Sequence, residues 1–211
     1  MKILVVGATG KTGREVMTQA LSHGHSVVAL ARRPQAVTLQ HARLTVVKGD
    51  VLDATSLGPA CDGVDAVISA LGIGASRAPT RVYSDGIRHI LTAMQAAGTG
   101  RIVVVSAEPA GPWAPHTLLR RVVLFPILQR LFGATYDDMR RMETILRDSA
   151  AQWTVLRPPR LLDKPARNAY RLNPDGPLKK GPTLTYADLA TALIDVLGQP
   201  NLTRKAVAVA N

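Results

Sequence analysis

A glycine-rich turn between a short apolar run and a segment of helical spacing constrains this chain more than any other feature. Residues 2–6 are mostly apolar and rich in β-branched side chains, and the sequence GATGKTG follows at 7–13. Apolar residues then recur at helical spacing over 16–21. A strand, a glycine turn and a helix in this order present backbone N–H groups to a pyrophosphate. We therefore expect a dinucleotide-binding turn; the alternative is a structural glycine turn in another α/β protein.

The same turn contains Gly10, Lys11 and Thr12, which look like the end of a P-loop. A P-loop also requires glycine five residues before Gly10, where this chain has Val5. The turn is too short to wrap a β-phosphate, so we do not expect nucleoside triphosphatase activity.

Composition favours one globular domain spanning residues 1–211, because hydrophobic residues make up 46% of the chain. Arginine or proline interrupts each apolar run before it reaches the length of a membrane span. The chain starts directly with a strand and shows no signal peptide, and Cys61 is its single cysteine. These features predict a cytoplasmic protein without a disulfide bond.

The formal net charge of +11 is spread along the chain rather than gathered in a tail. It indicates either a solvated basic surface or a pocket for anionic ligands. We expect no nucleic-acid partner, because aromatic residues are only 4% of the chain and no recognition helix is evident. The five histidines are scattered, so we expect no metal site, and only His116 merits a test.

Strand-like and helix-like segments alternate, which predicts an α/β fold of Rossmann type, with a doubly wound parallel sheet. Strands are expected at 3–6, 26–31, 44–48, 66–70, 101–106, 153–156 and 206–209. Helices are expected at 12–23, 54–61, 80–97, 136–149 and 186–197. Gly24 and Gly98 are expected to end helices, and Asp53 and Thr80 to cap them.

Two segments interrupt this alternation. Residues 111–135 form an apolar insertion, predicted to be one helix or two helices split at Pro126. The insertion can serve as core packing, a lid, a subunit interface or a membrane-surface contact, and we favour a lid or an interface. Residues 157–183, rich in proline and arginine, are predicted to form a small C-terminal substrate lobe over the sheet.

Ligands of open parallel sheets bind beyond the carboxyl ends of the strands, so the residues that follow each strand are the candidate site. The predicted cofactor-binding residues are Gly7, Thr9, Gly10, Lys11, Thr12, Gly13, Arg32, Arg33, Asp50, Val51, Ala70, Leu71, Gly72, Ser106 and Pro158. Asp50 is expected to accept from the adenine amino group, and Val51 to pack against the ring.

Arg32 and Arg33 follow the second strand, where an NAD-binding protein usually has an acidic residue. A planar guanidinium can bind the 2′-phosphate of NADP bidentately, so NADP(H) is expected and NAD(H) is less favoured. If both are ordinary surface arginines, the preference stays open.

The segments GATGKTG, ARRP, KGDVLD, VISALG, VVVSA and WTVLRPPRL, in this order, resemble the atypical short-chain dehydrogenase/reductases. Within them, the chain is most similar to the branch of biliverdin and flavin reductases. The resemblance implies a Rossmann fold, NADPH, and hydride transfer to a flavin- or tetrapyrrole-like acceptor, with Ser106 at the active site. Arg160 stands where the branch has a histidine, which favours an acidic group on the acceptor.

The tyrosine and lysine pair of most short-chain dehydrogenases, spaced Y-x-x-x-K, is missing. Tyr136 and Arg140 have the spacing with arginine substituted, so Tyr136 is either a catalytic residue or simply the start of a helix. Alcohol oxidation and epimerisation, which need that base, are accordingly less favoured.

The sequence therefore predicts an NADPH-dependent reductase with Ser106, Arg160 and Tyr136 as candidate catalytic residues. The acceptor is expected to be a small molecule that is anionic or planar aromatic, such as a flavin-, tetrapyrrole- or quinone-like compound. The protein is expected to be a monomer or homodimer. The alternatives are a non-catalytic NADP(H) sensor of NmrA-like type and an epimerase or dehydratase of the same fold.

Overall fold

The computed structural model describes residues 1–74 and 76–211. Within them, eight strands form one sheet in the order β3-β2-β1-β4-β5-β6-β10-β8. The parallel strands are β1 Lys2–Val6, β2 Ser26–Ala31, β3 Leu44–Lys48, β4 Ala66–Ser69, β5 Arg101–Val105, β6 Gln152–Arg157 and β10 Lys205–Ala210. At the edge, β8 (Arg171–Asn173) runs antiparallel to β10.

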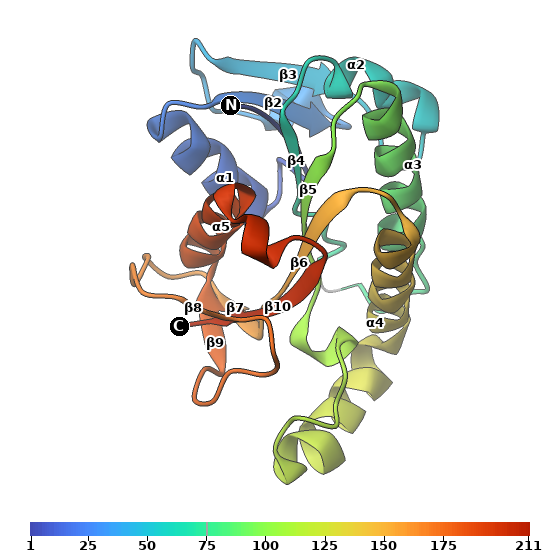
Figure 1. Cartoon of the computed structure of the whole chain (residues 1–211), viewed down its shortest axis with the longest axis vertical. Helices are drawn as coiled ribbons and strands as arrows, with labels where there is room; N and C mark the ends of the chain where they lie inside the picture. Colours follow the sequence, from blue (N-terminus) through green and yellow to red (C-terminus); the bar gives the residue numbers. More distant parts are fainter. Residues whose placement is uncertain (75) are drawn as a thin grey trace.

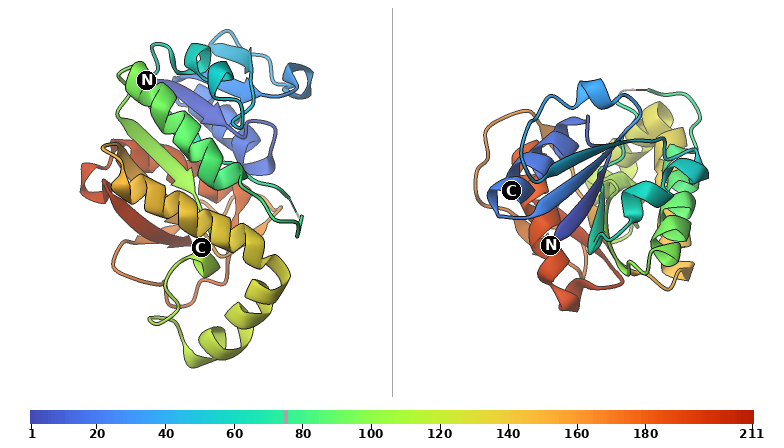
Figure 2. Two further views of the ribbon diagram at one scale, coloured as in Figure 1. Left: turned by 90° about the vertical axis from the view of Figure 1, so that its right-hand side faces the viewer. Right: turned by 90° about the horizontal axis from the view of Figure 1, so that it is seen from above.

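Helices cover both faces of this sheet (Figures 1 and 2). The helices are α1 Lys11–Ser22, α2 Gly58–Cys61, α3 Val82–Ala96, α4 Phe125–Asp148 and α5 Tyr186–Asp195. Short 3₁₀ turns lie at Pro34–Ala36, Ala54–Ser56, Glu108–Ala110, Val196–Gly198 and Pro200–Leu202. The strand order reverses beside β1, as in the doubly wound Rossmann-like fold that the sequence predicts.

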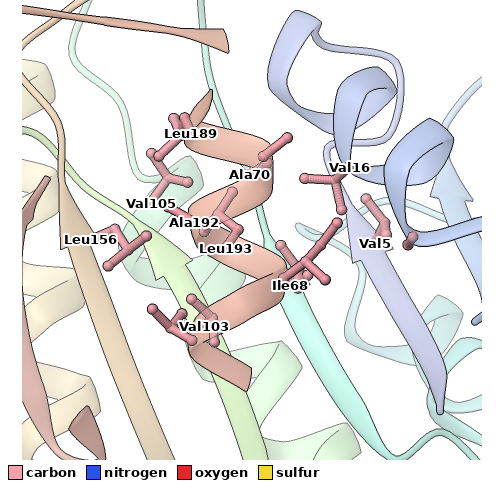
Figure 3. Packing of buried hydrophobic residues seen from close by; sticks show 14 of the residues in the cluster. Val5, Val16, Ile68, Ala70, Val103, Val105, Leu156, Leu189, Ala192 and Leu193 are labelled. Carbon is pink, nitrogen blue, oxygen red and sulfur yellow. The ribbon is translucent and has the colours of Figure 1, made fainter. Parts of the chain in front are cut away.

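Side chains alternate along each central strand and so divide the core into two layers. Ile3 and Val5 of β1 face α1 and α5, whereas Leu4 and Val6 face the opposite layer with α3 and α4. Figure 3 shows Leu193 of α5 in the first layer, close to the strands of the sheet. The central strands are thus buried on both faces of the sheet. This burial explains why their sequences are continuous apolar runs.

The expected strands all occur, with bounds that differ by one residue at most. The predicted helix at 54–61 was wrong: a 3₁₀ turn at Ala54–Ser56 and the short α2 take its place. Pro59 lacks the N–H that a continuous helix would need there, so the two turns separate. Asp53 accepts from the backbone N–H of Thr55, which confirms its predicted capping role.

Gly24 and Gly98 have φ values of +85° and +71° directly after α1 and α3, as expected for residues that end helices. At the start of α3, the hydroxyl of Thr80 accepts from the N–H of Val82 at 3.2 Å. The N-cap residue of α3 is Arg81, whose side chain makes no capping hydrogen bond. The buried Asp138 carboxylate of α4 instead accepts from the N–H groups of Tyr83 at 2.9 Å and Ser84 at 3.4 Å.

The chain is helical from residue 118 to the end of α4, with a π-helical turn at Arg120–Leu124 directly before α4. Pro126 lies at the start of α4, directly after the π-helical turn, and the chain stays helical across it. The break from helical geometry falls at Phe132, with φ −131° and ψ 19°. The predicted helix at 136–149 is thus the second half of a longer one, whose first half projects from the molecule (Figure 1).

Beyond β6, the chain forms a small separate sheet in which β7 (Arg160–Leu162) pairs in parallel with β9 (Thr183–Thr185). Asp188 of α5 anchors the loop between them by accepting from the N–H groups of Arg167 and Asn168, each at 3.0 Å. In the described residues, no helix is long and apolar enough to cross a membrane.

We expect Asp138→Ala to lower the free energy of unfolding by about 2 kcal/mol, because it leaves the first N–H groups of α3 without their buried acceptor. Urea denaturation would measure the change. The neighbouring variant Asp137→Ala is the control, since Asp137 is exposed. Equal stability of Asp138→Ala and the wild-type protein would contradict this cap.

Candidate functional site

The glycine turn after β1 is packed so closely that side chains do not fit at two of its positions. Gly7 has φ +82°, and a Cβ on it would lie 2.4 Å from the carbonyl oxygen of Ala70. A Cβ on Gly13 would lie 2.2 Å from the carbonyl oxygen of Gly7. Both distances are far inside van der Waals contact, so glycine is required here to join β1, β4 and α1.

The N-terminus of α1 at this turn has no capping side chain and no acidic residue in its first turn. Its N-cap is Gly10, in extended conformation, so the next backbone N–H groups have no side-chain acceptor on the helix. A helix start with this arrangement favours an anion such as a pyrophosphate. The turn and the helix start therefore fit the dinucleotide that the fold implies.

The polar side chains of the turn lie in different environments. Thr9 is exposed and Thr12 is buried. Lys11 places its Nζ 2.8 Å from the carboxylate of Asp163, and this hydrogen bond raises the pKa of the Lys11 ammonium. The same Nζ lies 5.5 Å from the ring centre of Tyr186. Lys11 thus connects the turn to the chain beyond β7, a contact that sequence reasoning did not foresee.

Arg32 and Arg33 directly follow β2, and both are exposed. The sequence has no acidic residue between Glu15 and Asp50, so no carboxylate of that stretch competes for their guanidinium groups. After β3, the carboxylate of Asp50 accepts from the N–H of Leu52 at 3.0 Å. The next residue, Val51, is buried.

At the end of β4, the N–H of Ala70 donates to the carbonyl of Val6, which holds this strand end against β1. Leu71 is partly buried in the layer that contains α3 and α4, and Gly72 is exposed. Ser69 precedes them, and in the described part of the chain its buried hydroxyl oxygen has no hydrogen-bond partner. A bound group at this edge could provide one.

Ser106, after β5, belongs to a buried polar network that the sequence did not reveal. Its hydroxyl donates to a carboxylate oxygen of Glu143 on α4 at 2.8 Å. Glu143 also pairs with Arg157 of β6, whose guanidinium donates to both oxygens of the Glu143 carboxylate. With its proton directed to Glu143, the Ser106 oxygen can still accept a hydrogen bond from a ligand.

A second charged group lies where the chain leaves β5. Glu108 pairs with Arg120, and its carboxylate lies 3.7 Å from Nδ1 of His116. Burial raises the pKa of Glu108, with an opposing effect of Arg120, whereas burial lowers the pKa of His116. His116 is thus favoured in its neutral form. A cavity of about 240 Å³ is lined by Glu108, His116, Arg157 and Asp175 together with prolines, glycines and alanines.

Tyr136 is partly buried, and burial raises the pKa of its phenol above the ordinary value. Arg140 donates instead to Asp137 at 2.5 Å, to Gln129 at 3.1 Å and to the carbonyl of Pro109 at 2.9 Å. An acid–base tyrosine needs a lowered pKa near neutral pH, which is the opposite shift. A catalytic role for Tyr136 stays a prediction.

The remaining predicted residues follow β6. Pro158 is buried, and its carbonyl accepts from the N–H of Glu108 at 2.9 Å. Arg160 begins β7 opposite Thr183 and is exposed. No group of three or more metal-ligating side chains occurs within residues 1–74 and 76–211.

Gly13→Ala tests the close packing of the turn. We expect it to lower the free energy of unfolding by about 2 kcal/mol, because the added carbon overlaps backbone atoms that must then move. Dinucleotide binding should weaken at least about tenfold, since the N–H groups of the α1 start move with them. Thermal unfolding and a binding titration measure the two effects.

The matched control is Gly58→Ala, because a Cβ on Gly58 meets open space. It should leave both quantities nearly unchanged. A Gly13→Ala variant that binds dinucleotide like the wild-type protein would contradict the close packing.

Two curated proteins are similar to this chain in sequence. The photosystem II assembly factor Ycf39 of Synechocystis is 37% identical over 122 residues, which cover 56% of this chain and 37% of that protein. A (4-alkanoyl-5-oxo-2,5-dihydrofuran-3-yl)methyl phosphate reductase of Streptomyces griseus is 32% identical over 157 residues, covering 74% of this chain and 46% of the enzyme. The chain thus spans less than half the length of either relative.

Solved structures share the fold over the whole chain. ChuY, an anaerobilin reductase from Escherichia coli O157:H7, superposes with a TM-score of 0.82 at 23% identity and is covered over 97% of its length. A short-chain dehydrogenase/reductase from Veillonella parvula, solved in complex with NADP, has a TM-score of 0.81 at 20% identity and 94% coverage. Both likenesses cover 100% of this chain.

The match to a family profile is more extensive than any curated relative above. It runs from the first glycine of the turn at residue 7 to residue 200, across the sheet and the helices that position the strand ends. With the glycine turn, the strand order and this match in agreement, the chain belongs to the NAD(P)H-binding family.

Proposed function

We propose that this protein is an NADPH-dependent reductase that transfers a hydride to a planar acceptor of flavin, tetrapyrrole or quinone type. The observation that carries the proposal is the glycine turn, where Gly7 and Gly13 exclude any Cβ beside an uncapped helix start. Two of the similar proteins are themselves named as reductases, those of Streptomyces griseus and Escherichia coli.

The preference for NADPH rests on Arg32 and Arg33. A 2′-phosphate carries a negative charge that two exposed guanidinium groups can bind through charge-assisted hydrogen bonds. A ribose 2′-hydroxyl would instead call for a nearby carboxylate, and the sequence has none between Glu15 and Asp50.

When bound, NADPH supplies the hydride, and the residues of this chain bind, orient and shield the reacting groups. The N-terminus of α1 would hold the pyrophosphate, and Asp50 with Val51 would hold the adenine. Ala70, Leu71, Gly72 and Pro158 would line the nicotinamide end. Ser106 would accept a hydrogen bond there, and the fixed charge of Arg160 would attract an acidic group of the acceptor.

The proton that completes the reduction would come from solvent in this proposal. Tyr136 has a raised pKa, and Arg140 is engaged by Asp137, so neither is set up for proton transfer near neutral pH. Reduction of a flavin- or quinone-like ring depends mainly on proximity of donor and acceptor. The same observation makes alcohol oxidation and epimerisation weaker candidates.

A non-catalytic NADP(H) sensor is the second candidate. The observation in its favour is that the Ser106 hydroxyl already donates to the buried Glu143, whose other contacts go to Arg157. A site whose polar groups pair with one another can hold a dinucleotide without offering a donor to an acceptor.

The direct test is loss of NADPH absorbance with FMN, riboflavin and small quinones as acceptors, with thermal-shift titration of NADP(H) in parallel. A reductase turns over NADPH with at least one acceptor. Tight NADP(H) binding without turnover for every acceptor would favour the sensor instead.

The cofactor preference has its own test in the double variant Arg32→Gln/Arg33→Gln. We expect kcat/KM with NADPH to fall about 10- to 100-fold, mainly through KM, because charge-assisted hydrogen bonds to the 2′-phosphate are lost. With NADH, which lacks that phosphate, the change should stay within about threefold. The control Lys48→Gln removes an exposed cation from neighbouring β3. An equal fall with both cofactors would overturn the assignment.

A further inference from the structure

Large apolar side chains lie exposed along the projecting helical segment of residues 118–131, which we call the arm. Among the described residues, seven of the nine exposed large apolar side chains belong to it, namely Leu118, Leu119, Val122, Val123, Leu124, Ile127 and Leu131. The first three are 71%, 70% and 63% exposed, so most of the surface of each residue lies in solvent. A cluster of exposed apolar side chains within one short helical segment marks an interaction site.

The arm is held in place by its inner side, so its apolar side chains cannot simply turn inward. Phe125 is fully buried and packs against the rings of Trp113 and His116, with ring centres 5.5 Å and 4.8 Å away. Arg120 is tied to Glu108 by an ion pair. Figures 1 and 2 show the yellow-green arm projecting beyond the sheet and the other helices.

The charge on the arm has one sign. Arg120, Arg121 and Arg130 lie among its apolar residues, and the sequence contains no acidic residue between Glu108 and Asp137. Arg121 and Arg130 are exposed. The whole chain has a formal net charge of +11, so the electrostatic potential around the protein is positive, like the charge of the arm. Exposed apolar side chains interspersed with arginine are the composition of a helix that lies in the interface of an anionic bilayer.

A second copy of the chain fits this surface less well. In a two-fold contact the same patch meets itself, so the exposed Arg121 and Arg130 of one copy would face an equally positive patch of the other. The arm has no carboxylate to offset that repulsion, because its sequence is free of acidic residues. An anionic lipid surface suits both features of the arm. Its acyl chains can take up the leucine and valine side chains, and its negative headgroups attract the arginines.

We propose that the arm docks the protein on anionic phospholipid membranes, with Leu119, Val123 and Ile127 entering the boundary between headgroups and acyl chains. The arm lies on the membrane and does not span it. Docking is independent of cofactor binding and turnover, so it stands or falls separately from the proposed reductase activity.

The test is flotation of the full-length protein with vesicles of equal parts phosphatidylcholine and phosphatidylglycerol, compared with vesicles of phosphatidylcholine alone. We expect binding to the anionic vesicles to be at least about tenfold stronger, and to weaken in high salt. The variant Val123→Glu/Ile127→Glu should lose about tenfold or more of this binding. Both side chains are exposed, so circular dichroism and thermal unfolding should match the wild-type protein.

Matched controls separate the arm from general surface properties. Leu52→Glu changes an apolar side chain of similar exposure elsewhere and should keep vesicle binding. A second variant, Arg121→Gln/Arg130→Gln, retains the apolar surface and should lose the preference for anionic vesicles, whereas Lys48→Gln/Lys205→Gln should retain it.

Absence of binding to anionic vesicles at low salt would overturn the proposal. So would equal binding by the wild-type protein and both arm variants. Light scattering coupled to size exclusion tests the other occupant: a dimer that Val123→Glu/Ile127→Glu converts to monomers would assign the arm to self-association and overturn membrane docking.

Discussion

The close packing of backbone atoms at the glycine turn, where no side chain fits, is the constraint on which the rest of the site depends. Gly7 meets the end of β4, and Gly13 meets Gly7 from the first turn of α1. This approach fixes the start of α1 directly beyond the central strand, where its free N–H groups face the carboxyl edge of the sheet. The residues after β2, β3 and β4 reach the same edge because these strands are parallel and in register with β1.

Two buried carboxylates on α4 join the other half of the molecule to this edge. Asp138 caps α3, and Glu143 holds Ser106 and Arg157 at the ends of β5 and β6. Buried charges are costly unless they are paired, and both carboxylates have guanidinium or N–H partners. These contacts connect α4 to the start of α3 and to the ends of β5 and β6, whereas the exposed apolar side chains of the arm lie at the other end of the same helix.

The features that the sequence predicts correctly are those set by neighbouring residues, namely the strands and the helix ends. The buried strands are β-branched runs, and helix ends at Gly24 and Gly98 are readable because only glycine adopts positive φ at low cost. The missed features depend on residues far apart in the chain. Asp138 and Tyr83 are 55 residues apart in the sequence, and Ser106 and Glu143 are 37 residues apart. Sequence spacing therefore does not predict either contact. Lys11 and Asp163 are a third case, at 152 residues apart.

In the proposed complex, NADPH binds across the strand ends, and its phosphates contact the glycine turn and Arg32 and Arg33. The most direct measurement is a crystal structure of the protein with NADP⁺. We expect the pyrophosphate at the start of α1 beside Gly10, and the 2′-phosphate within hydrogen-bond distance of at least one of the two guanidinium groups. A 2′-phosphate directed into solvent away from both arginines, or a dinucleotide bound away from the glycine turn, would contradict it.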